Sequence, residues 1–478
     1  MEEPAQLTEA LTRVLRSARA DAGLRVTSLE PLSSGASRRS FRVGVSGRDG
    51  EDELILQCAV KAAETAAATP LDGPLSMPLQ AELMRACAAA GVAAPPVVAA
   101  GEGDELGAEY IVTRLLPGEA LPPRLLREER WARGVRALSA DAARALATIH
   151  RLTPPDGLPV FDQLQRYRDR LDLMAEPRPL LELAYRWLQA NRPEPTSPSV
   201  VHGDFRMGNL LVDEDGLRAV LDWELAHVGD PYEDIAWASI RPWRFDRHRP
   251  AGAFPELEPW LQAYEAAAGQ ALDRERVRWW RVMGSWTWAV MSGMQARRHL
   301  DGIAASVEHA VIGRRVCESE WDLLELLPEA DGSPGRLPDP GPAVVPIDLP
   351  SAIRGVLADG DLHGRPTAVE LVDAVAGFLR DVVFPGADPA WRHQVRIAAH
   401  ALDQVNRELV LGPEQEQAHR IRLAELGART DTELAAAIRR GDFDGPAEQG
   451  RLRQRLAEDV RDRLLVANPG WMRLPPIT

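Results

Sequence analysis

Lysine is almost absent from the 478-residue sequence: Lys61 is the only one, and arginine supplies every other basic side chain apart from histidine. The 56 Lys and Arg residues are outnumbered by 71 Asp and Glu residues, which gives a formal net charge of −15 at pH 7. Nucleic acids and anionic membrane surfaces attract basic proteins. We therefore expect neither of them as a partner.

Cysteine is scarce as well. Cys58, Cys87 and Cys317 lack the spacing of a metal-binding motif and, being three, cannot all pair into disulfides. Reduced thiols are typical of the cytoplasm, where we expect this protein. The N-terminal residues lack the basic start and apolar stretch of a signal peptide. No apolar run reaches the roughly 18 residues that a membrane-spanning helix needs.

The sequence divides at a segment rich in proline and glycine, which make up ten of the 23 residues from 328 to 350. Such a composition predicts an extended linker. Residues 1–116 read as short strands and helices of a small lobe, and residues 117–327 as a larger, mostly helical lobe. With a linker at 328–348, residues 349–478 form a further all-helical domain. We therefore expect an α+β, two-lobed fold followed by an all-α domain.

Glycine and proline also divide this last domain. Its amphipathic segments are separated by these residues, so we expect separate helices before and after Gly412-Pro413. The domain is a candidate interaction or dimerisation surface.

The most informative stretch is "HGDFRMGN", residues 202–209, followed by "LLVDEDGLRAVLDWE". Phosphoryl transfer needs a group to accept the hydroxyl proton, cations at the phosphates and oxygen ligands for Mg²⁺. Asp204 can accept the proton, and Arg206 can contact the phosphate. Asn209 and Asp222 can ligate the metal. A hairpin with its turn at 213–216 would bring these last two together, although an ordinary polar loop between strands is the simpler reading of "HGD" alone.

The spacing resembles that of a known family. H-G-D-x-x-x-x-N followed thirteen residues later by D-W-E, and "ELAHVGDPYEDIAWAS" after it, are similar to the aminoglycoside phosphotransferases, which have the protein-kinase-like fold. The resemblance covers residues 25–325. With Arg two positions after Asp204, the loop most resembles the branch associated with acyl-CoA dehydrogenases. The resemblance implies ATP or GTP as co-substrate and a hydroxyacyl-CoA-like acceptor, whereas the acidic charge favours a cationic aminoglycoside.

By the same resemblance, Asp204 is the catalytic base, Arg206 contacts the γ-phosphate, and Asn209 and Asp222 hold Mg²⁺. His202 is expected to orient the loop. Asp230 and Asp234 are expected to brace the helical lobe through backbone hydrogen bonds, and Glu224 to support the metal site.

In the small lobe, "LSSGASRRSFRV" stands where the family has its nucleotide loop, and Ser34, Gly35 and Ser37 are expected to meet phosphate through backbone N–H groups. The cation of the following strand is ambiguous. One alignment puts Gln57 at that position, and another puts Lys61 there, paired with Glu82.

The hinge is expected at residues 113–116, where backbone groups of Thr113 and Leu115 would meet the base.

Two functions remain open. The first is a Mg²⁺-dependent small-molecule kinase, and the second is a pseudokinase-like binding or scaffold module, suggested by Gln57.

Overall fold

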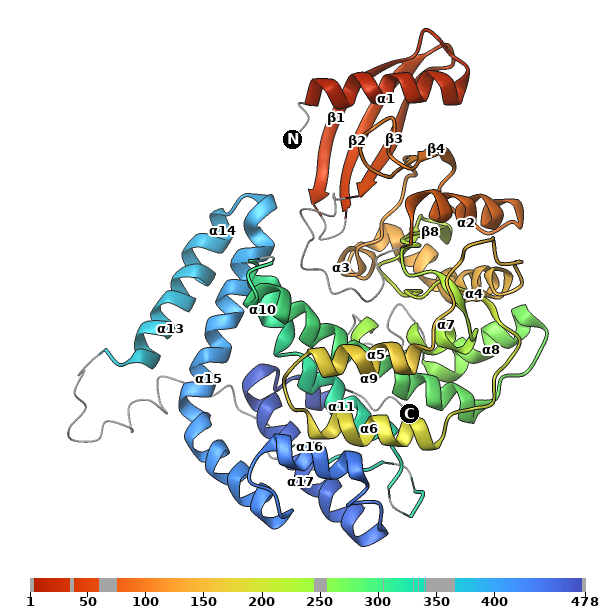
Figure 1. Ribbon diagram of the computed structural model, residues 1–478. Coiled ribbons are helices and arrows are strands. Elements are labelled where there is room, and N and C mark those ends of the chain that lie inside the picture. Colours follow the sequence, from red (N-terminus) through yellow and green to blue (C-terminus); the bar gives the residue numbers. More distant parts are fainter. Residues whose placement is uncertain are drawn as a thin grey trace. The chain divides into compact units, whose positions relative to one another are not determined.

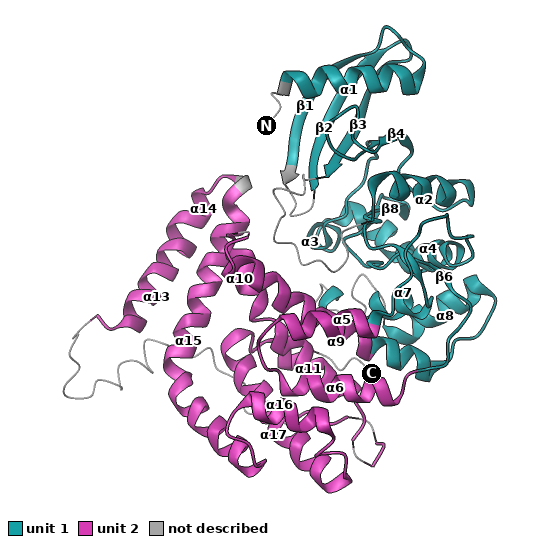
Figure 2. Cartoon of the chain, viewed as in Figure 1, with its two compact units in different colours: residues 1–163, 193–281 teal, residues 164–192, 282–478 magenta. Residues whose placement is uncertain are grey.

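The computed structural model describes residues 4–34, 38–59, 75–244, 256–338 without 304, 330 and 334, residue 340, and residues 366–474 (Figure 1). The chain forms two compact units (Figure 2). Unit 1 comprises residues 1–163 and 193–281, and unit 2 comprises residues 164–192 and 282–478.

Unit 1 begins with a five-stranded antiparallel sheet in the order β1-β2-β3-β5-β4. Its elements are α1 (Pro4–Arg19), β1 (Arg25–Ser34), β2 (Arg38–Gly47), β3 (Gly50–Ala59), α2 (Met77–Ala89), β4 (Val97–Gly101) and β5 (Tyr110–Arg114). Alternate residues of β3, namely Leu54, Leu56 and Cys58, are buried in one core with Leu11 and Leu15 of α1. This period of two is what a strand with one face on a helix requires.

The rest of unit 1 consists of helices and two short two-stranded sheets, β6-β9 and β7-β8. Its elements are α3 (Pro122–Leu125), η2 (Glu129–Trp131), α4 (Ala132–Ile149), β6 (Ser199–Val201), β7 (Leu210–Val212), β8 (Leu217–Val220), β9 (His227–Gly229), α7 (Tyr232–Trp237), η3 (Arg241–Trp243), α8 (Leu257–Ala268) and the first part of α9 (Arg274–Leu300). The predicted hairpin is confirmed: Leu210 pairs with Val220, and the N–H of Asp213 donates to the carbonyl of Gly216 at 3.0 Å.

All secondary-structure elements in the described residues of unit 2 are helices. It contains α5 (Gln163–Leu173) from residue 164, α6 (Pro179–Ala190), the end of α9, α10 (Val307–Gly313), α11 (Val316–Leu326), α13 (Ala368–Phe378), η4 (Leu379–Val383), α14 (Phe384–Gly386), α15 (Pro389–Glu425), α16 (Asp431–Arg440), α17 (Pro446–Ala467) and η5 (Trp471–Arg473). Leu180 of α6 and Trp321 of α11 share one buried core with Leu434, Leu456 and Leu464 of the last two long helices. Helices from both sides of the Pro/Gly-rich segment therefore pack together.

The expected break at Gly412-Pro413 is wrong, because α15 runs through it as one helix with Pro413 inside. Contacts on both sides of the proline explain this continuity. Before it, Gln404 donates to the carbonyl of Ala467, and after it, Gln415 donates to the carbonyl of Asp462, at 3.0 Å each. Packing on α17 therefore offsets the hydrogen bond that proline cannot make. Among the described residues, no helix is long and apolar enough to span a membrane.

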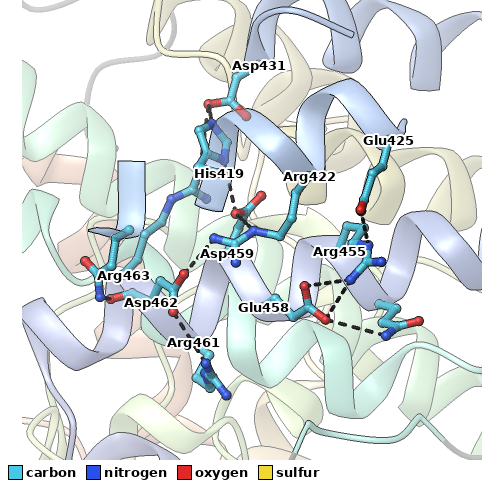
Figure 3. A network of polar contacts seen from close by, with 12 residues as sticks. His419, Arg422, Glu425, Asp431, Arg455, Glu458, Asp459, Arg461, Asp462 and Arg463 are labelled. Carbon is cyan, nitrogen blue, oxygen red and sulfur yellow. Dashed lines mark hydrogen bonds and ion pairs between the residues drawn. The ribbon is translucent and has the colours of Figure 1, made fainter. Parts of the chain in front are cut away.

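Charged side chains connect α15, α16 and α17 (Figure 3). His419 lies between two carboxylates, with Nε2 3.2 Å from Asp431 Oδ2 and Nδ1 3.0 Å from Asp459 Oδ1. Arg422 binds Asp459 and Asp462 at 2.6 Å each. Hydrogen bonds to Asp431 and Asp459 raise the pKa of His419 to about 9. The imidazole is therefore cationic at neutral pH.

This raised pKa predicts a pH-dependent stability. The stabilisation from His419 is complete below its unfolded pKa of about 6.5 and is lost as the pH rises through about 9. His419→Gln should lower the free energy of unfolding by on the order of 2 kcal/mol at pH 6, with little effect at pH 9.5. Denaturant titrations at both pH values measure the difference. His393→Gln, an exposed position on the same helix, is the control. An equal loss at both pH values would contradict the account.

Candidate active site

Asp204 is the centre of a hydrogen-bonded cluster in unit 1. Its Oδ1 accepts from Arg206 Nε at 2.9 Å and from the indole N–H of Trp237 at 2.8 Å. Its Oδ2 accepts from the side-chain amide of Asn209 at 2.6 Å. The structure thus brings together Asp204, Arg206 and Asn209, as their spacing predicted. The side chain of Asp204 is 14% exposed, so a small part of it remains open to solvent.

The backbone of the 202–209 loop is held by Asp234, whose side chain is fully buried. This carboxylate accepts from the backbone N–H groups of His202 at 2.7 Å and Gly203 at 2.9 Å, and it lies 3.2 Å from His150 Nε2. Burial alone would raise the pKa of Asp234, but the hydrogen bond with His150 and the neighbouring imidazoles lower it below its usual value. The predicted bracing role of Asp234 is confirmed.

Gly203 is required at its position for two reasons. Its φ of 80° lies in the left-handed region, which side chains disfavour. A Cβ there would also collide with the carbonyl oxygen of Leu225. The neighbouring His202 packs on Trp223 with ring centroids 4.6 Å apart, and its Nε2 bonds the carbonyl of Leu221 at 3.0 Å. This orients the loop, as expected for His202.

Asn209 and Asp222 stand at the open end of the β7-β8 hairpin. The N–H of Leu221 donates to the carbonyl of Asn209 at 2.8 Å, which places the next residue, Asp222, beside it. Asp222 has a φ of 64°, an uncommon value for a residue other than glycine. Since the amide nitrogen of Asn209 is bonded to Asp204, its amide oxygen is the atom that could ligate a cation.

Arg38, at the start of β2, was not singled out from the sequence. Its guanidinium lies 2.8 Å from Asp222 Oδ1 and also pairs with Glu224. Burial alone would lower the pKa of Arg38, but these carboxylates raise it above its usual value. The two carboxylates and the amide of Asn209 are hard oxygen donors of the kind Mg²⁺ prefers. Because a guanidinium already bridges the carboxylates, this donor set fits a cation. The only signal in the sequence was the basic pair that follows the Gly/Ser loop.

Aromatic side chains border Asp204. Trp237 of α7 and Trp243 of η3 lie with ring centroids 5.3 Å apart, and the guanidinium of Arg206 lies 4.5 Å from the ring centroid of Trp243. The sequence contains 13 tryptophans, so composition could not show which of them lie at the site.

Asp230 makes one of the backbone hydrogen bonds expected of it, and its other contacts are with side chains. Its carboxylate accepts from the N–H of Tyr232, from Arg276 and from the indole of Trp280, at 3.0, 2.9 and 3.0 Å. These bonds connect the chain after β9 to α7 and α9. Asp230 therefore stabilises the packing of α7 and α9 around the chain that follows β9.

The predicted nucleotide loop is described only in part. Ser34 ends β1, while Gly35, Ser37 and Lys61 lie outside the described residues. Glu82 is exposed on α2. The pairing of Lys61 with Glu82 stays a prediction.

Gln57 is half-buried on β3, where it pairs with Ser40 of β2 and Ile111 of β5. Gln57 and Ala59 lie on the same face of β3. The alternate residues Leu56 and Cys58 point to the other face, into the core shared with α1. The backbone of Gln57 is therefore paired regularly within the sheet, and its side chain lies on the face away from α1.

The expected hinge follows β5. Thr113 is buried and pairs with Ile55 of β3 and Val97 of β4, so its backbone belongs to the sheet. The N–H of Leu115 donates to the carbonyl of Glu53 at 2.9 Å. The structure therefore places these two residues at the C-terminal end of β5, an interior strand, where the chain leaves the sheet.

A crystal structure of a Ralstonia eutropha protein described as a candidate aminoglycoside phosphotransferase has a TM-score of 0.52 at 21% identity, over 66% of this chain and 95% of that one. The phosphotransferase enzyme family matches residues 28–280, more than half of the chain. This fold and this family match define the class of the protein, a small-molecule kinase with the protein-kinase-like fold. The chain belongs to the phosphotransferase enzyme family.

Short segments are similar to larger proteins. Acyl-CoA dehydrogenase family member 10 of Mus musculus is 39% identical over 64 residues, which are 13% of this chain and 6% of that protein. Acyl-CoA dehydrogenase family member 11 of Gallus gallus is 43% identical over 61 residues, 12% of this chain and 8% of that protein. The chain thus spans a small part of these relatives. Residues 385–471 match a family described as a domain of unknown function (DUF6285). The resemblance to the branch associated with acyl-CoA dehydrogenases is confirmed.

The contacts of Arg38 lead to a prediction. Arg38→Gln removes the guanidinium that bridges the carboxylates of Asp222 and Glu224, which should cost about 2 kcal/mol of stability. Mg²⁺ should raise the melting temperature of this variant more than that of the wild type, because it can replace the lost positive charge. Differential scanning calorimetry with and without Mg²⁺ measures both effects. Arg39→Gln, exposed on the same strand, is the control. An equal response to Mg²⁺ in all three proteins would refute the shared site.

Proposed function

We propose that unit 1 transfers the γ-phosphate of ATP or GTP to a hydroxyl group of a small molecule, with Mg²⁺. The observation that carries this proposal is the carboxylate of Asp204, held by Arg206, Trp237 and Asn209. A fixed, partly exposed carboxylate next to a guanidinium is what in-line phosphoryl transfer to an alcohol requires.

In this reaction Asp204 accepts the proton of the substrate hydroxyl. The hydroxyl oxygen forms a bond to the γ-phosphorus while the bond to the bridging oxygen of the nucleotide breaks, and the nucleoside diphosphate leaves. Arg206 is bonded to Asp204 and lies over the ring of Trp243, so its cation would lie beside a phosphoryl group transferred to a hydroxyl at Asp204. The positive charge stabilises the negative charge that develops on the phosphoryl oxygens.

Asn209 and Asp222 would hold Mg²⁺, through the amide oxygen and the carboxylate. When bound, the metal neutralises phosphate charge and orients the nucleotide. Arg38 would have to release Asp222 in this arrangement, and its guanidinium would then be available for phosphate. Support comes from the hairpin, which brings Asn209 and Asp222 side by side.

The nucleotide contacts proposed for the small lobe follow the family resemblance. Backbone N–H groups of Ser34, Gly35 and Ser37 would meet phosphate, and Lys61 with Glu82 would contribute the strand cation. The base would lie near Thr113 and Leu115. Since the N–H of Leu115 is already bonded to Glu53, its carbonyl is the available group for the base.

For the acceptor we propose a hydroxyacyl-CoA-like molecule. The similarity to acyl-CoA dehydrogenase family members 10 and 11 and the position of Arg206 favour it. The aromatic pair Trp237 and Trp243 beside Asp204 suits an acceptor with an apolar part next to its hydroxyl. A cationic aminoglycoside, favoured by the net charge, is the second candidate. A cytoplasmic location and a homodimer remain predictions from the sequence.

A pseudokinase-like scaffold is the competing function, and its specific support is Gln57 on β3. Calorimetric titration of ATP and GTP, with and without Mg²⁺, separates the two. We expect the wild type to bind one nucleotide with Mg²⁺ and Asp222→Ala to lose at least about tenfold in affinity, because a metal ligand is removed. Glu214→Gln, exposed in the turn of the same hairpin, should bind like the wild type. Binding of neither nucleotide at millimolar concentration would support the scaffold.

Asp204→Asn tests the base independently of binding. The asparagine keeps the size of the side chain but accepts no proton, so turnover should fall about 10²–10⁴-fold while the nucleotide affinity stays within about twofold. The assay measures nucleoside diphosphate release in a screen of hydroxyacyl-CoAs and aminoglycosides, with calorimetry for affinity. Full turnover by Asp204→Asn would exclude Asp204 as the base.

A further inference from the structure

The helix α13 and its continuation η4 carry an exposed apolar stripe in unit 2. It consists of Leu371, Val375, Phe378 and Val382, all exposed, with Phe378 at 56%. Their spacings are four, three and four residues, which is the heptad pattern of a helix that packs along its length on another helix. Solvent-facing helix positions are normally polar. This stripe therefore has the pattern of a helix-packing surface without a packing partner in the chain as described.

The opposite face of α13 packs on α15. Within α13, all of whose residues the structure describes, Ala376 is the only buried one. Arg380 of η4 binds Asp403 of α15 at 2.8 Å. The two helices form a hairpin, which can be followed in Figure 1 from α13 through α14 into α15. A two-helix hairpin can bury only one face of each helix.

The first half of α15 carries a second stripe of the same kind. Trp391, at 67% exposed, Val405 and Leu409 are exposed, and the intervening positions are half-buried. The complete stripe is spaced by four, three, four, three and four residues: Trp391, Val395, Ala398, Leu402, Val405 and Leu409. Tryptophan is enriched among the residues that contribute most to the binding energy of protein interfaces.

The charges of the hairpin are complementary between its helices. From 368 to 383, Glu370, Asp373 and Asp381 outnumber one basic residue, and this segment is acidic. From 391 to 409, the span of the second stripe, the balance is reversed, because three arginines (Arg392, Arg396 and Arg407) outnumber the two acidic residues Asp403 and Glu408. Arg407 donates to the carbonyl of Val466 of α17 at 2.6 Å, so Arg392 and Arg396 are the exposed cations. A second copy related by a two-fold axis would place each acidic helix on a basic one, with matching heptad stripes.

We propose that the α13–α15 hairpin forms a homodimer by packing on the same hairpin of a second copy of this chain, as an antiparallel four-helix bundle. Self-complementary charge and equal stripe spacing select a second copy over an unrelated protein. Four-helix bundles use this packing, and two-fold dimers use one surface twice. The interface lies in unit 2 and does not depend on the reaction of unit 1.

Sedimentation velocity of the full chain measures the dimer directly. We expect the wild type at about 10 µM to sediment at twice the chain mass of 52.5 kDa. Phe378→Glu/Val382→Glu should raise the dimer dissociation constant at least about 100-fold, because it puts two carboxylates into the apolar seam. Trp391→Glu should do the same from the other helix. Circular dichroism and the melting temperature show whether the variants fold, which their exposure predicts.

Ile421→Glu is the control, since Ile421 is equally exposed on α15 but lies outside the stripe. It should remain dimeric. A wild type that is monomeric at about 50 µM would overturn the proposal. A dimer that both stripe variants leave intact would overturn it as well. So would a hairpin that binds another protein in place of a second copy. Hydrogen exchange gives a second readout, because residues 368–409 should be protected more at high protein concentration.

Discussion

The site depends on one buried carboxylate. Asp234 is 32 residues from His202 in sequence, yet it accepts the backbone N–H groups of His202 and Gly203 and so fixes the direction in which the loop leaves β6. Asp204, Arg206 and Asn209 can converge because this first turn is fixed. A buried anion is costly unless hydrogen bonds compensate it. His150 and the two N–H groups supply that compensation, which makes the anchor rigid.

Much of this site was predictable from the sequence because its determinants are local. Asp204, Arg206 and Asn209 are separated by a few residues, and a hairpin of fixed length carries the chain from Asn209 to Asp222. Turn residues and apolar alternation specify such hairpins directly. The strands of the small lobe and the helical character of the tail followed from periodicity in the same way.

Contacts between segments that are distant in the sequence could not be predicted from the sequence. Arg38 meets Asp222 across 184 residues, and Trp237 meets Asp204 across 33, so neither pair shares a local pattern. Nothing in the sequence distinguishes Arg38 from the other arginines, or Trp237 from the other tryptophans among the 13. The continuous α15 was missed for a similar reason, because the packing of α17 overrides the local preference of Pro413 to end a helix.

The core shared by α6, α11, α16 and α17 bears on how such a chain can evolve. Trp321 and Leu324 are buried against residues that follow the Pro/Gly-rich segment, among them Leu452 and Leu456. A gene that lost its 3′ part would expose these apolar side chains, and selection would then favour polar replacements on α6 and α11. The tail and the helices before it therefore constrain each other's substitutions, although one family matches residues 28–280, which include α6, and another matches residues 385–471 of the tail.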